Sequence, residues 1–267
     1  MRRAATAACL TLAVAARTYA QSPAPPPPSP DFLTRYNFHL AANTLTIKDP
    51  RFSWETHFGG DLDLVDFVTG RASMLVDYQA ILGDQLRPFD PNQSYYILEA
   101  SSSYRTPWVE IAGVFHHVSR HLSDRDKTFP IAWNVVGARA LRRIEVSGTR
   151  IDTYGGVGVV AGHSNVDYSW TADLDVAIRR AVSSRVGLFA HAHAERFGVD
   201  GLVRVAEDGT PLTRGSQAGG RVEAGVRFDG RAGALELFAG YERRIDAGPS
   251  GFLPARWGIA GFRLVGR

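Results

Sequence analysis

Three residues with the chemistry for acyl transfer occupy alternate positions in the chain: His117, Ser119 and His121. A serine hydroxyl becomes a useful nucleophile when an adjacent imidazole takes its proton. Residues two positions apart share one face of a β-strand, so a strand here would gather the hydroxyl and both rings. The spacing therefore indicates a candidate site for nucleophilic catalysis, provided that the segment is a strand.

The segment that leads into this cluster alternates as a strand with two different faces does. One face holds Val109, Ile111, Gly113, Phe115, His117, Ser119 and His121, and the other holds Trp108, Glu110, Ala112, Val114, His116 and Arg120. If the apolar face meets lipid, His117 and Ser119 point outward near the end of the strand. Polar groups are less costly there than at the centre of a bilayer, yet two of them together need a reason.

The same period-two pattern continues through the chain from Tyr36 onward. Twelve candidate strands are expected at 36–47, 52–65, 70–82, 92–104, 107–119, 130–144, 149–163, 167–180, 184–197, 218–229, 231–243 and 255–265. Their connections alternate between tight turns and longer polar loops, such as 199–217. This pattern is typical of outer-membrane barrels. The sequence predicts an all-β protein: a closed, antiparallel, up-and-down transmembrane β-barrel of about 12 strands.

Large aromatic residues lie near the ends of these predicted strands. They are Tyr95, Tyr96, Tyr104, Trp108, Trp133, Tyr168, Trp170 and Trp257. Tyrosine and tryptophan are enriched where a membrane surface meets water, so we expect these residues to form an interfacial girdle around the barrel.

The chain before the barrel divides into two segments. Residues 1–20 combine a basic start, an apolar stretch and small residues before Gln21, which is typical of a cleaved signal peptide. Residues 21–33 are rich in proline and form a predicted extended linker. The barrel is expected over 34–267. The single cysteine, Cys9, lies within the signal, so the mature protein would have no disulfide.

Charge argues against a nucleic-acid partner. The chain has 30 Lys and Arg against 27 Asp and Glu. Removal of the signal peptide takes away Arg2, Arg3 and Arg17 and leaves 27 of each sign. The mature protein is therefore neutral and has no basic stripe that would bind phosphates.

The His-x-Ser pair near the outer end of a lipid-facing strand resembles outer-membrane phospholipase A and the lipid A deacylases of the same membrane. The resemblance implies that His117 is the general base and Ser119 the nucleophile. Arg120 follows the serine where the phospholipase family has asparagine. The implied activity is hydrolysis of an acyl ester in phospholipid or lipopolysaccharide at the outer leaflet.

That family orients its histidine with an asparagine across the next hairpin, and Asn134 is the nearest candidate here. Asp124 and Asp126 in the intervening loop are alternatives. Their carboxylates would serve either as the orienting group or as oxygen ligands for Ca²⁺.

A longer run of letters is similar to another group. His117-Val-Ser119-Arg-His121-Leu122-Ser-Asp124 resembles a His-x-Ser-Ser-His-Leu-Gly-Asp run in a family of bacterial outer-membrane proteins without a known activity. This resemblance implies a barrel and an important role for this hairpin, and it implies nothing about the substrate.

A possible metal site occurs in the predicted ninth strand. His191, His193 and Glu195 alternate along one polar face, a spacing that can supply ligands to one ion such as Zn²⁺. That face would line the lumen beside Asp173 and Asp175. The alternative is a network of lumenal charges that only bond one another.

Two non-enzymatic functions also remain open. The protein is either a structural or surface-interaction barrel whose 198–217 loop meets a partner, or a narrow pore with a charged lumen. Histidine and serine at a strand end also occur simply because the headgroup region tolerates them. In every case we expect export to the outer membrane of a Gram-negative bacterium, insertion by the barrel-assembly machinery, and contact with phospholipid or lipopolysaccharide.

Overall fold

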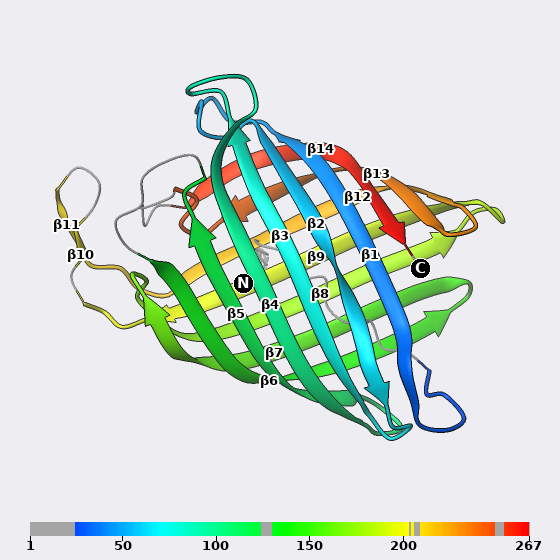
Figure 1. Cartoon of the computed structure of the whole chain (residues 1–267). Helices are drawn as coiled ribbons and strands as arrows, with labels where there is room; N and C mark the ends of the chain where they lie inside the picture. Colours follow the sequence, from blue (N-terminus) through cyan, green and yellow to red (C-terminus); the bar gives the residue numbers. More distant parts are fainter. Residues whose placement is uncertain (1–24, 124–129, 203, 206–208, 249–253, 267) are drawn as a thin grey trace, which may run out of the picture.

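A computed structural model describes residues 25–123, 130–202, 204–205, 209–248 and 254–266. Within them, twelve long strands close into one antiparallel barrel, and β10 (Arg204–Val205) and β11 (Pro211–Leu212) form a separate small hairpin (Figure 1). The barrel strands are β1 (Asp31–Leu45), β2 (Trp54–Asp66), β3 (Arg71–Gly83), β4 (Asp90–Arg105), β5 (Glu110–His121), β6 (Ile131–Val146), β7 (Thr149–Ser164), β8 (Tyr168–Ala181), β9 (Val186–Val199), β12 (Gln217–Asp229), β13 (Gly233–Arg244) and β14 (Ala255–Gly266). No helix in these ranges is long and apolar enough to cross a membrane.

Each barrel strand pairs with its neighbours along the chain, and β1 closes the barrel against β14. The predicted fold is therefore confirmed. β1 begins at Asp31, inside the segment expected to be linker, directly after the last proline of that segment. β5 starts three residues later than predicted, because the Thr106 hydroxyl accepts from the Val109 amide and donates to its carbonyl, which holds a turn.

Apolar side chains cover the outside of the barrel and charged side chains fill its lumen. Among the large apolar residues exposed on the outside are Phe58, Val76, Leu98, Phe115, Val136, Leu174, Leu188, Leu237 and Leu264. The buried charged residues of the inside include Glu55, Asp63, Arg71, Asp77, Glu99, Arg139, Arg221, Glu223, Glu236 and Glu242. This arrangement is the reverse of a water-soluble protein and typical of a membrane barrel.

The predicted aromatic girdle is only half right. Tyr96, Tyr104, Trp108 and Trp170 are exposed on the outside, as expected. The other four, Tyr95, Trp133, Tyr168 and Trp257, are buried inside the barrel. Tyr95 and Tyr96 are consecutive, so strand alternation sends only one of them outward. A shift in register between Tyr168 and Trp170 separates those two rings, which uninterrupted alternation would have placed on one face.

The loops fold over the end of the barrel where β5 ends and β6 begins. Arg214, in the long connection after β9, hydrogen-bonds with Asp167 and Asp246 of two other connections. Burial alone would lower the pKa of Arg214, but its bonds to the two carboxylates raise it above its ordinary value. Gln93 donates to the Ala247 carbonyl (2.7 Å), which holds the last loop inside the barrel mouth.

Candidate active site

The hairpin of β5 and β6 brings His117 and Asn134 together on the outside of the barrel. The two residues are direct partners in the strand register. His117 Nδ1 lies 2.7 Å from Asn134 Oδ1, and because an amide oxygen only accepts, the ring must donate from Nδ1. The neutral ring then keeps a lone pair on Nε2, the state that a general base requires. Asn134 also donates to the Gly162 carbonyl (3.4 Å), which fixes the direction of its amide.

Ser119 lies on the same outward face, between two histidines. Its hydroxyl hydrogen-bonds with His121 Nε2 at 3.2 Å, and not with the His117 ring that the sequence favoured. The His121 ring packs edge-on against Tyr96, with centroids 5.0 Å apart. The i, i+2 spacing had placed His121 on this face, but its contact with the hydroxyl was not foreseen.

Small and apolar side chains surround the cluster. Ala132 stands opposite Ser119 in the register, and Gly162 stands opposite Asn134. Neither fills the space above the serine and the histidine. One step further along the strands, Phe115 and Val136 form an apolar pair that is about half exposed. The polar cluster therefore borders an apolar surface on the side of the barrel centre.

Arg120, which follows the proposed nucleophile in the sequence, takes no part in this cluster. Arg120 points into the lumen, is 5% exposed, and donates to the Gly248 carbonyl (3.1 Å). It therefore cannot act in place of the asparagine that the phospholipase family has at this position. Asp124 and Asp126 lie outside the described residues, and so does the Ca²⁺ site proposed for them.

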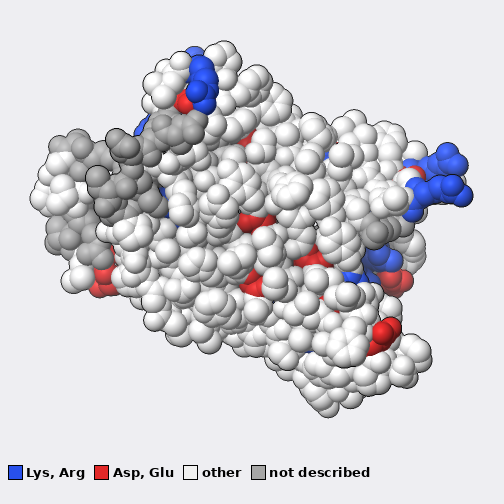
Figure 2. Space-filling model, in the orientation of Figure 1, with Lys and Arg blue, Asp and Glu red and all other residues white. Residues whose placement is uncertain are grey.

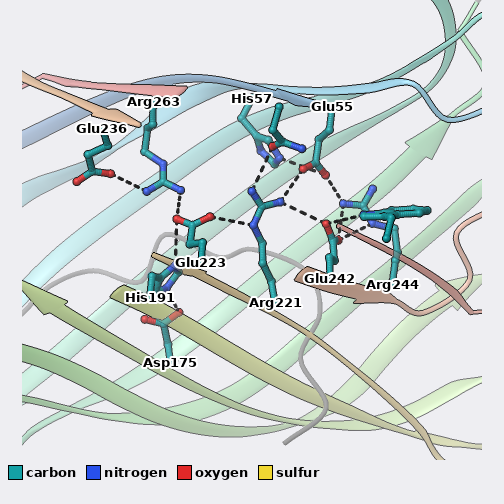
Figure 3. A network of polar contacts seen from close by, with 12 residues as sticks. Glu55, His57, Asp175, His191, Arg221, Glu223, Glu236, Glu242, Arg244 and Arg263 are labelled. Atoms are coloured by element: carbon teal, nitrogen blue, oxygen red, sulfur yellow. Dashed lines mark hydrogen bonds and ion pairs between the residues drawn. The ribbon is translucent and has the colours of Figure 1, made fainter. Parts of the chain in front are cut away.

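A dense network of ion pairs crosses the lumen (Figure 3). Arg221 of β12 bonds Glu55 of β2 (2.8 Å), Glu223 (3.0 Å) and Glu242 (3.3 Å). Arg244 joins Glu55 and Glu242 from β13. The contacts of Glu55 with Arg221 and Arg244 join β2 to β12 and β13, which are not its neighbours in the wall, so the network crosses the inside of the barrel. Buried charges of this kind are stable only when they are paired.

The histidines of β9 belong to this network. His191 and His193 both contact Asp175, at 2.7 and 3.5 Å, and Glu195 makes no contact with either ring. Within the described residues, no three histidine, cysteine, aspartate or glutamate side chains are placed to hold a metal ion. Asp175 contacts both rings, and the metal site expected at His191, His193 and Glu195 stays a prediction.

Comparison with known proteins supports the fold. LpxR from Salmonella typhimurium is 9% identical, over 86% of this chain and 99% of that one, with a TM-score of 0.50. An active-site mutant of outer membrane phospholipase A from Escherichia coli is 10% identical, over 88% of this chain and 91% of that one, also with a TM-score of 0.50. No protein-family model and no curated protein matches the sequence. At such low identity the similarity concerns the fold alone.

Proposed function

We propose that this protein is an outer-membrane hydrolase of lipid acyl esters, with Ser119 as nucleophile and His117 as general base. The observation that carries the proposal is the hydrogen bond between His117 Nδ1 and Asn134 Oδ1 beside an outward-facing serine. A serine, a histidine and an orienting amide form a complete nucleophilic set. The substrate is phospholipid or lipopolysaccharide, because the set lies on the surface that faces lipid.

Placement in the outer membrane of a Gram-negative bacterium is supported by the surface of the barrel. In Figure 2 the side turned to the viewer is mostly uncharged, and blue side chains gather toward the two ends. The first residue of β1, Asp31, and the last residue of β14, Gly266, lie at the end of the barrel where the turns are short. Export through a cleaved signal peptide and insertion by the barrel-assembly machinery complete the proposal.

The reaction follows from the positions of the side chains. Rotation about the Cα–Cβ bond of Ser119 moves its hydroxyl from His121 to His117. The serine oxygen then attacks the ester carbonyl carbon while its proton passes to His117 Nε2. A bond forms between the serine oxygen and the acyl carbon, and the bond from that carbon to the alcohol oxygen breaks. The alcohol leaves with that proton, and a water activated by the same ring hydrolyses the acyl-serine to release the fatty acid.

The fold neighbours agree with this proposal without carrying it. One of the two is named a phospholipase. The narrow-pore alternative has less support, because the ion pairs of Glu55, Arg221 and Glu242 occupy the lumen. In a purely structural barrel the headgroup region would tolerate the histidine and the serine, but the hydrogen bond that orients the His117 ring beside the serine would have no role.

The test is release of fatty acid from phospholipid or lipid A by the folded, full-length protein in detergent micelles. Ser119→Ala should lower the rate about 10³-fold or more, because no other group forms the acyl intermediate. The control is Ser102→Ala, since Ser102 is another outward serine and stands opposite Gly113. Undiminished hydrolysis by the Ser119 variant would end the proposal.

The same assay separates the two histidines. His117→Ala should reduce hydrolysis as far as the serine variant does, because residues that act as a unit are not additive. His121→Ala should retain most of the activity. The reverse order would make His121 the base and the His117–Asn134 contact structural.

A further inference from the structure

A cavity of about 140 Å³ lies inside the barrel, away from the proposed catalytic residues. Its walls include Tyr95 of β4, Trp133 of β6, Tyr168 of β8 and Phe197 of β9. The last three rings form one cluster, in which Tyr168 and Phe197 are 4.4 Å apart and Trp133 and Tyr168 are 5.3 Å apart. An aromatic wall of this kind presents ring faces and edges to the cavity.

Two carboxyl groups face the same cavity. Asp173 and Glu195 line it and are direct cross-strand partners of β8 and β9. Like charges in that relation repel. Glu195 has no hydrogen bond or ion pair with any described residue, and Asp173 has only a 3.9 Å contact with Arg139 Nε. Asp173 Oδ2 is buried without a hydrogen-bond partner in the described ranges.

Two of the three arginines that line the cavity, Arg139 and Arg244, are bonded to other acids, and the third, Arg120, donates to the Gly248 carbonyl (3.1 Å). Arg139 bonds both carboxylate oxygens of Glu99, at 2.7 and 3.2 Å. Arg244 is held by Glu55 and Glu242 on the side of the ion-pair network. Asp173 and Glu195 therefore differ from the other lumenal carboxylates described above, each of which has a close arginine or histidine partner.

Neighbouring acids show the contrast most clearly. Asp175 lies two residues from Asp173 on the same face of β8, and it is bonded to His191 (2.7 Å). Asp246, at the mouth, bonds Arg214 and the Tyr168 hydroxyl. Among the described residues, Asp173 with its single long ion pair and Glu195 with none both lie where the cavity leaves room beside them.

We infer that this cavity binds a small organic cation with a primary or quaternary ammonium group. The ammonium would lie between Asp173 and Glu195, where it removes their repulsion, and its carbon substituents would pack on the aromatic wall. Aromatic faces attract such cations, with tryptophan the strongest. A cavity of roughly 150 Å³ accepts a molecule the size of benzene, so the ligand has about six or seven non-hydrogen atoms.

The ligand could be a free amine or the headgroup of a lipid, and the experiment separates them. Choline and pentylamine, which both match that size, are titrated into the folded, full-length protein in maltoside micelles at constant ionic strength. Binding is measured by calorimetry and by tryptophan fluorescence. Short-chain phosphatidylcholine and phosphatidylglycerol are then added in parallel; competition by the first alone identifies a headgroup as the source.

Glu195→Gln should weaken binding of the cation about tenfold or more, since it removes the charge beside the ammonium. Without ligand, the same variant should raise the unfolding temperature, because the repulsion with Asp173 is relieved. Asp152→Asn is the control, because this lumenal carboxyl is paired with Arg143 and does not line the cavity. The inference would be overturned if the Glu195 variant bound the cation as tightly as the wild type, or if it unfolded at a lower temperature than the wild type. It would also be overturned if none of these probes bound to the wild-type protein.

Discussion

Polar residues gather in two places in this barrel, and the two gatherings differ in how completely they are paired. In the lumen, Arg221 is 2% exposed and contacts three carboxylates. On the outside, His117 and Ser119 are partly exposed, and each has a single hydrogen bond with the described residues. The network around Arg221 therefore consists of charges held in place by their partners, whereas His117 and Ser119 of the outer cluster can still form further hydrogen bonds.

This difference in pairing indicates a structural role for the lumenal network and a chemical role for the outer cluster. Charges that leave water must be matched by partners, so the lumenal network follows from closing a barrel around polar residues. Nothing of that kind requires a serine, two histidines and an asparagine on the apolar surface. His117 uses only Nδ1 in its contact with Asn134, so Nε2 is available to a substrate or to Ser119. A general base needs a ring of fixed orientation with one nitrogen free to accept a proton.

The largest expected effect concerns the lumen. Arg221→Ala leaves Glu55, Glu223 and Glu242 without their shared partner, which should cost about 3–5 kcal/mol of unfolding free energy. Denaturant unfolding in micelles measures this loss. The control is Arg150→Ala, whose pair with Glu145 is exposed and worth about 1 kcal/mol or less. A loss no larger than that of the control would show that the network is not what holds the lumen.

The next effect concerns the outer cluster and is smaller. Asn134→Ala removes the hydrogen bond that orients His117, and a bond of about 1–1.5 kcal/mol corresponds to roughly a tenfold lower kcat/KM. The unfolding free energy should hardly change. Fatty-acid release measures the first quantity and denaturant unfolding the second. Val136→Ala, two positions along the same face, should leave the rate unaltered; an Asn134 variant that loses stability instead of activity would place the pair with the structural network.

Most of the fold could be predicted from the sequence, because the alternation of apolar and polar residues is a local property. Period two located the twelve barrel strands, and it correctly placed His117 and Ser119 on the outward face. Where alternation was interrupted, prediction failed. The register shift at Tyr168 turned an expected girdle residue into a lining residue of the internal cavity.

Partners across the lumen could not be predicted for a different reason. The contact of Glu55 with Arg221 joins residues 166 positions apart, and it depends on how the barrel closes. Asp175, which contacts both histidines of the expected metal site, is different: it lies on the neighbouring strand β8, and alternation had already placed it beside them. The hydrogen bond between Ser119 and His121 is local, but it depends on side-chain rotation, which residue type alone does not determine.

The smallest effect belongs to an ion pair outside the barrel wall, between Asp49 and Arg51 in the loop after β1. Side-chain hydrogen bonds from Arg51 lower the pKa of Asp49. A lowered pKa stabilises the fold above the carboxyl's unfolded value of about 3.9, and that stabilisation disappears as the pH falls through the lowered value. Because solvent screens the pair, Asp49→Asn should change the unfolding free energy at pH 7 by about 0.5 kcal/mol or less.

Comparing unfolding of this variant and the wild type between pH 7 and pH 3 (about one unit below the unfolded pKa of aspartate) measures that difference and its loss in acid. The Asp49–Arg51 contact has the same chemical groups as the lumenal network and a similar distance, 2.7 Å, but water surrounds it. A penalty as large as that of the Arg221 variant would mean that ion pairing itself stabilises this barrel. A small penalty would mean that each lumenal charge needs its partner because it is buried away from water. The outer cluster does not need complete pairing, because it is only partly buried.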